Sequence, residues 1–317
     1  MYPESRERSV GVISPRERLT YLAAMAAEKY NALRFNFKNV ELLYRLPEGV
    51  LPLTKWLFYE FASHISYGQG DMPVTVGIET IAACNRSCPY CVVEKPEFGS
   101  SRKTFVMDDV TYEGILSGLR GFRRIGSTHG FNGALFLNGY GEPLLDKKIA
   151  ARVALARRIL PDARIGLFSN GDFLTEETFL GLAQAGVNKV VLTPHDGSFK
   201  HEVYEVASRY KELGILQLNK PLEFFSNRGG MINVPRDKLI SPTSRCISST
   251  YSFWVAADGT IAMCCNDATL TVPMGIAGQK PLLDTWNSPE YMRTRQALRH
   301  GRWDELPEIC TKCRVGV

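Results

Sequence analysis

The chain has 317 residues, about twice the length of a typical single domain. Hydrophobic residues make up 44% and charged residues 22% of the composition, which excludes a largely disordered chain. The 38 Lys and Arg residues exceed the 33 Asp and Glu residues by a formal charge of only +5, and no dense basic stripe indicates a nucleic-acid partner.

Residues 1–70 predict a helical N-terminal extension, because apolar residues recur at helical spacing over 15–34 and 52–64. Residues 1–10 lack the apolar region of a signal peptide, and no apolar stretch is long enough to span a membrane. We therefore expect a cytoplasmic protein with no membrane partner. The extension is either a helical cap packed on the next domain or a lid over the substrate.

Short strand-like runs alternate with helical segments from residue 71 to residue 236, which is typical of a parallel sheet, either open or closed into a barrel. In such folds the chemistry lies where strands end, at the carboxyl edge of the sheet. The expected strands are 74–80, 134–138, 164–169, 189–193 and 215–219, and the expected helices are 108–125, 147–160, 176–185 and 202–213.

The pattern changes in residues 237–317, where we expect a small second domain of α+β type. Strands over 251–256 and 260–264 flank Asp258-Gly259, which is a strong tight-turn signal. A helix is expected over 290–299, and a Cys-x-x-Cys pair, Cys310 and Cys313, closes the segment.

The eight cysteines fall into two groups, of three and five residues. Clusters of this kind in a long chain indicate metal ligation or catalysis, whereas a secreted disulfide scaffold spreads its cysteines through a short chain. The first group is Cys84, Cys88 and Cys91, and the second is Cys246, Cys264, Cys265, Cys310 and Cys313.

The first group, Cys84-x3-Cys88-x2-Cys91, directly follows the first expected strand. Three thiolates can bind three irons of a cubane cluster and leave the fourth iron for another molecule, whereas an electron-transfer cluster is closed by four cysteines. A zinc site with a distant fourth ligand is the alternative. With the aromatic Tyr90 before its third cysteine, the motif resembles that of the radical S-adenosylmethionine (radical SAM) superfamily.

Two later segments resemble motifs of the same family. The segment after the second strand contains Gly139, Gly141, Glu142 and Pro143, in which glycines allow close backbone approach to a ligand and Glu142 supplies a carboxylate for an ammonium group. The resemblance implies that this segment holds the methionine amine of the cofactor, and that Ser169 and Asn170, with Tyr90, help to bind it. Without the cysteines, a capped turn and a strand-to-helix turn would explain both segments.

The resemblance implies a partial (β/α)6 TIM-like barrel that binds a [4Fe-4S] cluster with an open iron and S-adenosyl-L-methionine. One electron from the reduced cluster would cleave this cofactor, and the resulting deoxyadenosyl radical would take a hydrogen atom from a substrate. The substrate would be a small molecule, of natural-product, sugar or aminocyclitol type, or a peptide. A flavodoxin- or ferredoxin-type protein would donate the electron, and the protein would orient the reactants and exclude competing reactions.

The second cysteine group resembles the SPASM/twitch class of auxiliary-cluster domains. The cysteine count supports one auxiliary [4Fe-4S] cluster, as in the shorter twitch form, and the whole layout resembles that of an aminocyclitol dehydrogenase within the superfamily. A structural four-cysteine zinc site is the alternative. The expected ligands are Cys246, Cys264, Cys310 and Cys313.

Three further residues carry open interpretations. Strand alternation would place Cys265 on the face opposite Cys264, where it is an inert buried residue, a hydrogen-atom donor or a replacement ligand. His195, after the fourth strand, is a candidate for substrate binding or proton transfer, or a structural residue. Arg228, in a Gly-rich loop, is a candidate for contact with cofactor or substrate through a carboxylate or phosphate.

The reaction is therefore expected to be an oxidation in which the auxiliary cluster accepts the second electron. The runner-up is an epimerisation completed by Cys265, and peptide maturation is a further alternative. A cluster carrier without catalysis would leave Glu142, Ser169 and Asn170 without a function.

Overall fold

The computed structural model describes residues 72–93, 95–99, 102, 105–123, 127, 129–221, 226–233, 246 and 249–313, together with 57, 60–61 and 63–64. The predicted N-terminal extension therefore lies almost entirely outside the described residues. In the described part of the chain, no helix has the length and apolar character needed to cross a membrane.

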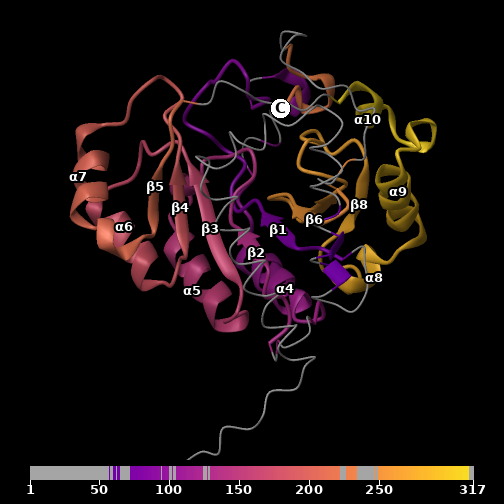
Figure 1. The fold of residues 1–317 in the computed structure, drawn as a ribbon, viewed down its shortest axis with the longest axis horizontal. Helices are drawn as coiled ribbons and strands as arrows, with labels where there is room; N and C mark the ends of the chain where they lie inside the picture. The colour runs from indigo at the N-terminus through magenta and orange to yellow at the C-terminus, as the bar shows by residue number, and fades with distance from the viewer. Residues whose placement is uncertain are drawn as a thin grey trace, which may run out of the picture.

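An eight-stranded sheet of order β5-β4-β3-β2-β1-β6-β7-β8 runs through the described residues, which confirms the α/β class and is consistent with a partial barrel (Figure 1). Its first five strands pair in parallel and alternate with helices. These strands are β1 (Thr75–Ile78), β2 (Ala134–Phe136), β3 (Arg164–Ser169), β4 (Lys189–Leu192) and β5 (Leu216–Leu218). The helices between them are α4 (Asp109–Leu119), α5 (Ile149–Ile159), α6 (Glu176–Gln184) and α7 (His201–Arg209).

Local hydrogen bonds account for the start of two of these helices and for one helix end that the sequence predicted incorrectly. The side chains of Asp108 and Thr175 accept N–H hydrogen bonds at the first turns of α4 and α6. Helix α4 ends at Leu119, although the sequence predicts a helix as far as residue 125. The chain turns at this point, and the carbonyl of Leu119 accepts hydrogen bonds from the N–H groups of Phe122 and Phe131.

The sixth parallel strand comes from the C-terminal segment. Strand β6 (Ser252–Val255) pairs in parallel with β1, with Thr75 opposite Ser252. Strands β7 (Thr260–Ala262) and β8 (Pro273–Ile276) then continue the sheet in antiparallel fashion. The segments 71–236 and 237–317 therefore contribute strands to the same sheet.

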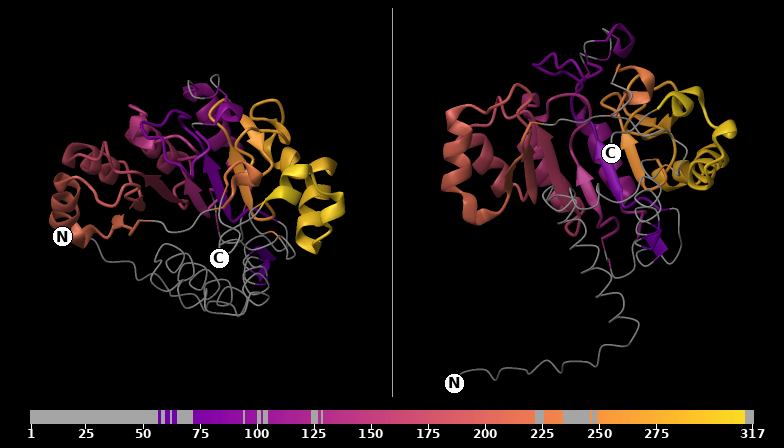
Figure 2. Two further views of the ribbon diagram at one scale, coloured as in Figure 1. Left: turned by 90° about the horizontal axis from the view of Figure 1, so that it is seen from above. Right: turned by 45° about the horizontal axis from the view of Figure 1, so that its top comes forward.

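Three helices complete the C-terminal segment: α8 (Leu282–Trp286), α9 (Pro289–His300) and α10 (Glu308–Lys312). Helix α9 has Ser288 as its N-cap, and Gly301 ends it at φ 68°, a conformation that suits glycine. Figure 2 shows these helices at the opposite end of the sheet from α6 and α7. The sequence missed β8, α8 and α10, each of which has at most five residues.

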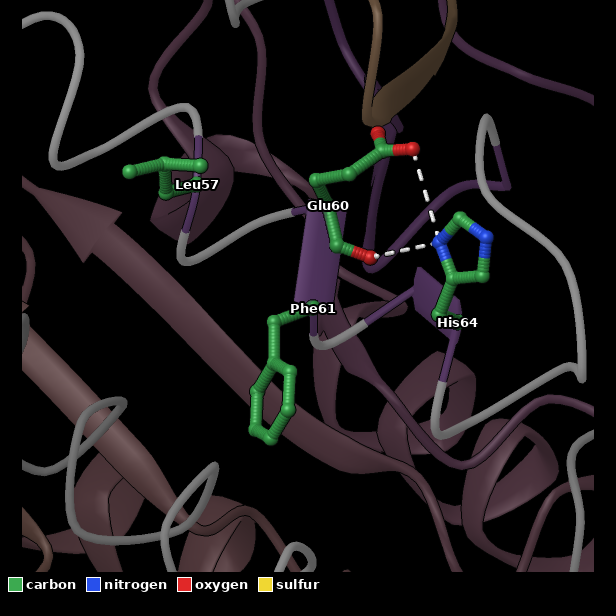
Figure 3. Close-up of a pocket in the computed structure, with 4 residues that line it drawn as sticks. All are labelled: Leu57, Glu60, Phe61 and His64. Carbon is green, nitrogen blue, oxygen red and sulfur yellow. Dashed lines mark hydrogen bonds and ion pairs between the residues drawn. The ribbon is translucent and has the colours of Figure 1, made fainter.

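Glu60 connects the described residues before the sheet to the C-terminal segment. Its carboxylate accepts hydrogen bonds from the Tyr251 hydroxyl and the Arg299 guanidinium. His64 Nδ1 lies 3.2 Å from the main-chain oxygen of Glu60, as Figure 3 shows. A cavity of about 550 Å³ lies here, lined by Leu57, Glu60, Phe61 and His64.

Candidate active site

The three cysteines of the first group lie on one loop that begins six residues after β1. Cys84, Cys88 and Cys91 are all half-buried. The pKa of Cys84 is raised to about 11, mainly by burial, with a smaller contribution from negative charge on Glu142 and on the two other thiols and an opposing hydrogen bond from the Arg86 N–H. Burial also raises the pKa of Cys88. Positive charge, such as that of iron, would therefore be needed to hold Cys84 and Cys88 as thiolates at neutral pH.

The glycine-rich segment after β2 packs against the backbone between β1 and the cysteine loop. The N–H of Glu142 donates to the carbonyl of Ala83 over 2.8 Å. A Cβ on Gly141 would lie 2.0 Å from the carbonyl oxygen of Ile81, and one on Gly139 would lie 2.5 Å from Glu79 Oε1. Both glycines are thus required by packing within the protein, a reason different from the ligand approach that the sequence predicts.

Glu142, Ser169 and Asn170 come together in direct contact. The buried Glu142 carboxylate accepts hydrogen bonds from Ser169 Oγ (2.7 Å), Asn170 N (2.9 Å) and Leu144 N (2.9 Å). Burial raises its pKa. The third bond caps the 3-10 turn that begins at Pro143, as the capped-turn alternative predicts. A role of Glu142 toward the methionine amine remains a prediction.

Tyr90 and His195 form a hydrogen-bonded pair beside the first cysteines. Tyr90 Oη lies 2.5 Å from His195 Nδ1, and the hydroxyl also bonds to Cys88. Burial raises the pKa of Tyr90 and lowers that of His195, which favours the neutral imidazole. Both residues thus lie beside the cysteine loop. The sequence predicts a cofactor contact for Tyr90 and a substrate contact for His195.

A network of charged and polar side chains, which the sequence did not reveal, lies beside the same part of the cysteine loop. Arg86 binds both carboxylate oxygens of Asp172, at 2.6 and 2.5 Å, and lies 3.0 Å from Asp196. Asn85 donates to Asp172 over 2.6 Å, and the Arg86 contact lowers the pKa of Asp172. This network borders a cavity of about 580 Å³. The sequence offers no signal for it, because its partners are about 87 residues apart.

The second cysteine group converges from three separate segments. Cys264 follows β7, Cys310 lies in α10, and Cys313 directly follows that helix. The pKa of Cys310 is raised to about 12 and that of Cys313 to about 11, in both cases first by burial and next by negative charge on Cys246. The pKa of Cys264 is raised by burial and by charge on Cys265, Cys246 and Cys313. The four predicted ligands therefore lie close together.

The alternation argument for Cys265 is wrong, because β7 ends at Ala262 and both Cys264 and Cys265 lie in the turn that follows. The two cysteines have different hydrogen-bond partners. The sulfur of Cys264 accepts a hydrogen bond from the N–H of Asn266 over 3.3 Å. The main-chain oxygen of Cys265 accepts one from the Tyr140 hydroxyl over 2.6 Å.

Arg228 lies between the two cysteine groups. Its guanidinium carbon is 5.4 Å from the centre of the Tyr140 ring. Burial lowers its pKa, but charge on Tyr140, Cys265 and Cys91 outweighs this and leaves the pKa raised. Thiols of both cysteine groups therefore affect the pKa of Arg228, which is consistent with the cofactor or substrate contact predicted for this residue.

Both donor sets fit iron–sulfur clusters in number and chemistry, because a cubane takes one thiolate per iron. No cysteine is in a disulfide. Within the described residues, no three or more His, Cys, Asp and Glu side chains are arranged to hold a single metal ion.

Comparison with known families agrees with this geometry. The model of the Radical SAM superfamily matches residues 78–227, and that of the iron-sulfur cluster-binding domain SPASM matches residues 246–314. The S-adenosyl-L-methionine-dependent 2-deoxy-scyllo-inosamine dehydrogenase of Niallia circulans is 29% identical over 243 residues. These residues are 75% of this chain and 91% of that enzyme.

Solved structures have the same fold. The crystal structure of BtrN in complex with AdoMet and 2-DOIA has a TM-score of 0.63 and 26% identity, covering 76% of this chain and 92% of that chain. BtrN in an open conformation has a TM-score of 0.55 with 22% identity, covering 76% of this chain and 92% of that chain.

Proposed function

We propose that this chain, which belongs to the radical SAM superfamily and carries a SPASM-type region, oxidises an alcohol carbon of a small aminocyclitol-like molecule to a ketone. The observation that carries the proposal is its similarity to a dehydrogenase over 91% of that enzyme's length. The proximity of the four thiols Cys246, Cys264, Cys310 and Cys313 supports it, because an oxidation needs an electron acceptor after hydrogen abstraction.

The two family domains imply a radical SAM [4Fe-4S] cluster, an auxiliary cluster and bound S-adenosyl-L-methionine. We infer that Cys84, Cys88 and Cys91 hold the first cluster. We further infer that the second is held by Cys246, Cys264, Cys310 and Cys313. When bound, these groups supply one-electron cleavage of S-adenosyl-L-methionine and an acceptor for the substrate's second electron.

The chain's own residues orient these groups. Glu142 holds Ser169 and the Asn170 backbone at the end of β3, next to Cys84, which fixes the polar edge where the cofactor's amino acid part would bind. Arg86 and Asp172 brace the cysteine loop against the same edge. The half-buried Tyr140 and Arg228 are in ring–cation contact beside the cysteine groups, where they would limit access of water.

The overall reaction balances in atoms and electrons. The carbinol hydrogen atom would end in 5′-deoxyadenosine, the second electron would be accepted at the site formed by Cys246, Cys264, Cys310 and Cys313, and the hydroxyl proton would go to solvent. The electron spent in cleaving S-adenosyl-L-methionine is thus recovered, and one cofactor molecule is consumed per ketone. A flavodoxin- or ferredoxin-type protein is the proposed source of the first electron.

The test uses the full chain, reconstituted without oxygen with iron and sulfide and given dithionite and S-adenosyl-L-methionine. The probe is 2-deoxy-scyllo-inosamine deuterated at its carbinol carbons. We expect one deuterated 5′-deoxyadenosine per ketone formed, and none from Cys84→Ala. If deoxyadenosine forms without deuterium from this probe, the aminocyclitol substrate is wrong, and if none forms at all, the radical mechanism is wrong.

The two other outcomes are distinguishable in the same experiment. Epimerisation would return an inverted alcohol carrying solvent hydrogen, and Cys265→Ala would stop that inversion while leaving a dehydrogenation intact. A peptide-modifying enzyme would leave 2-deoxy-scyllo-inosamine unchanged.

A further inference from the structure

Asn266 contacts the sulfurs of two proposed auxiliary-cluster ligands. Its backbone N–H donates to Cys264 Sγ over 3.3 Å, and its side-chain Nδ2 lies 3.7 Å from Cys313 Sγ. Asn266 is buried, and neither contact was evident from the sequence.

The orientation of the Asn266 amide is determined by its other partners. Ser226 Oγ lies 2.9 Å and Arg228 Nη1 3.3 Å from the side-chain oxygen of Asn266. Arginine only donates hydrogen bonds, so the atom facing Arg228 must be the amide oxygen. The amide nitrogen is therefore directed at Cys313.

The loop that holds Asn266 in place is itself attached to α10. Asn227 Nδ2 donates to the carbonyl of Lys312 over 2.9 Å, and the N–H of Gly229 bonds to the sulfur of Cys313. Gly229 has φ 67°, and a Cβ there would lie 2.4 Å from Ile309 Cγ1. The sulfur of Cys313 is therefore bordered by two N–H donors on a tightly packed loop.

We propose that Asn266 is a positioning residue whose amide, directed by Ser226 and Arg228 onto Cys313, raises the reduction potential of the auxiliary cluster. Hydrogen bonds to ligand sulfurs withdraw negative charge from a cluster and so favour its reduced form. Asn266 thereby makes the auxiliary cluster a better acceptor for the electron that leaves the substrate. This inference rests on the proposed auxiliary cluster but on no particular substrate.

The experiment measures the potential directly. In the full chain carrying Cys84→Ala, Cys88→Ala and Cys91→Ala, only the auxiliary cluster remains, and its reduction is followed by electron paramagnetic resonance at poised potentials. Asn266→Asp keeps the shape, removes the side-chain donor and adds a negative charge. We expect a tenfold lower ratio of reduced to oxidised cluster at a fixed potential, which is about 59 mV for one electron.

Two further variants and a control make the result specific. Asn266→Ala removes the side-chain donor without adding charge, and Ser226→Ala removes one orienting contact, so both should shift the potential in the same direction but less. Asn287→Asp adds the same charge at an exposed site in the same half of the chain and should leave the potential unchanged.

The possible outcomes distinguish failure of this inference from failure of its premise, which is that the chain binds an auxiliary cluster. If the triple cysteine variant binds no cluster, the premise of an auxiliary cluster fails. If it binds one and both Asn266 variants titrate like their parent, the premise holds and the role of Asn266 is refuted. If all three variants at Asn266 and Ser226 lose the cluster entirely, the amide is needed for assembly and the tuning role is likewise refuted.

Discussion

Gly141 illustrates how a single missing side chain determines the candidate site. The segment after β2 crosses the chain leading to the cysteine loop at Gly141, where a Cβ would lie 2.0 Å from a backbone oxygen that has little freedom to move. The adjacent Glu142 is held by that crossing, so the contact connects backbone packing to the placement of a candidate cofactor ligand.

We expect Gly141→Ala to lower the free energy of unfolding by about 3 kcal/mol, because overpacking against backbone forces the loop to shift. Urea denaturation of the metal-free protein measures this. The matched control is Gly114→Ala in α4, where a Cβ meets no atom within 4 Å. Removing glycine from that helix should stabilise by about 0.5–1 kcal/mol. Equal effects of the two substitutions would contradict the packing argument.

At this scale the sequence predicted the cysteines, Glu142, Ser169 and Asn170, because they stand in short motifs at strand ends. It did not predict Arg86 or Asn266, because their hydrogen-bond partners are chosen by tertiary structure. For Asn266 the nearest signal was its position two residues after Cys264, where a backbone N–H commonly reaches a ligand sulfur. Nothing local indicated that its side chain would reach Cys313.

Glu79, directly after β1, connects several elements. Its buried carboxylate accepts hydrogen bonds from Arg102 Nη2 (2.7 Å), Tyr140 N (2.8 Å) and Ala257 N (3.1 Å). It therefore ties the end of β1 to the segment after β2 and to the turn between β6 and β7.

We expect Glu79→Gln to destabilise the protein by about 3 kcal/mol, because it breaks a buried ion pair with Arg102 and turns an amide donor toward another donor. Thermal and urea unfolding would show the loss. The same substitution at Glu177, which is exposed in α6, should change stability by less than about 0.5 kcal/mol. A Glu79→Gln protein as stable as the Glu177→Gln protein would show that the pair contributes nothing.

Secondary structure could be predicted from the sequence where a strand is long and most of its side chains are buried. The strand at 164–169 matches β3 at both ends, because five of its six residues are apolar or small and its flanks contain Pro161 and Gly171. The turn after β7 was not predictable, because the residues from Thr260 to Cys264 have the pattern of a continuous strand. The chain instead turns after Ala262, and the Asp267 carboxylate accepts the N–H groups of Thr271 and Val272.

On the scale of the whole molecule, the parallel pairing of β6 with β1 makes the sheet continuous from one end of the described chain to the other. The sequence predicts residues 237–317 as a separate domain, because no local sequence pattern indicates that two strands about 177 residues apart will pair. Removing that segment would leave all four buried residues of β1 at an unpaired edge.

We therefore expect a chain ended after residue 236 to aggregate, even when its first cysteine group is intact. Size-exclusion chromatography measures the monomer fraction, and the full-length chain lacking Cys310 and Cys313 is the control for loss of the auxiliary cluster alone. A monomeric, folded product from the shortened chain would show that β1 tolerates an open edge.

Iron content tests the division of the cysteines into two sites. The reconstituted protein should contain about eight iron and eight sulfide per chain, as two four-iron clusters require. The triple substitution of Cys84, Cys88 and Cys91 by alanine should halve both numbers, and so should Cys310→Ala with Cys313→Ala. A colourless protein that contains zinc and no sulfide would contradict both assignments.

The pairing of β1 with β6 also influences the distance between the two cysteine groups. Cys84 follows β1 by six residues, and Cys264 follows β7, which pairs with β6, so the sheet register contributes to the distance between the two cysteine groups. Electron tunnelling slows exponentially with distance, and one residue of slippage displaces a strand by about 3.3 Å. Register between β1 and β6 would thus affect the rate at which an electron could pass between clusters bound at these cysteines.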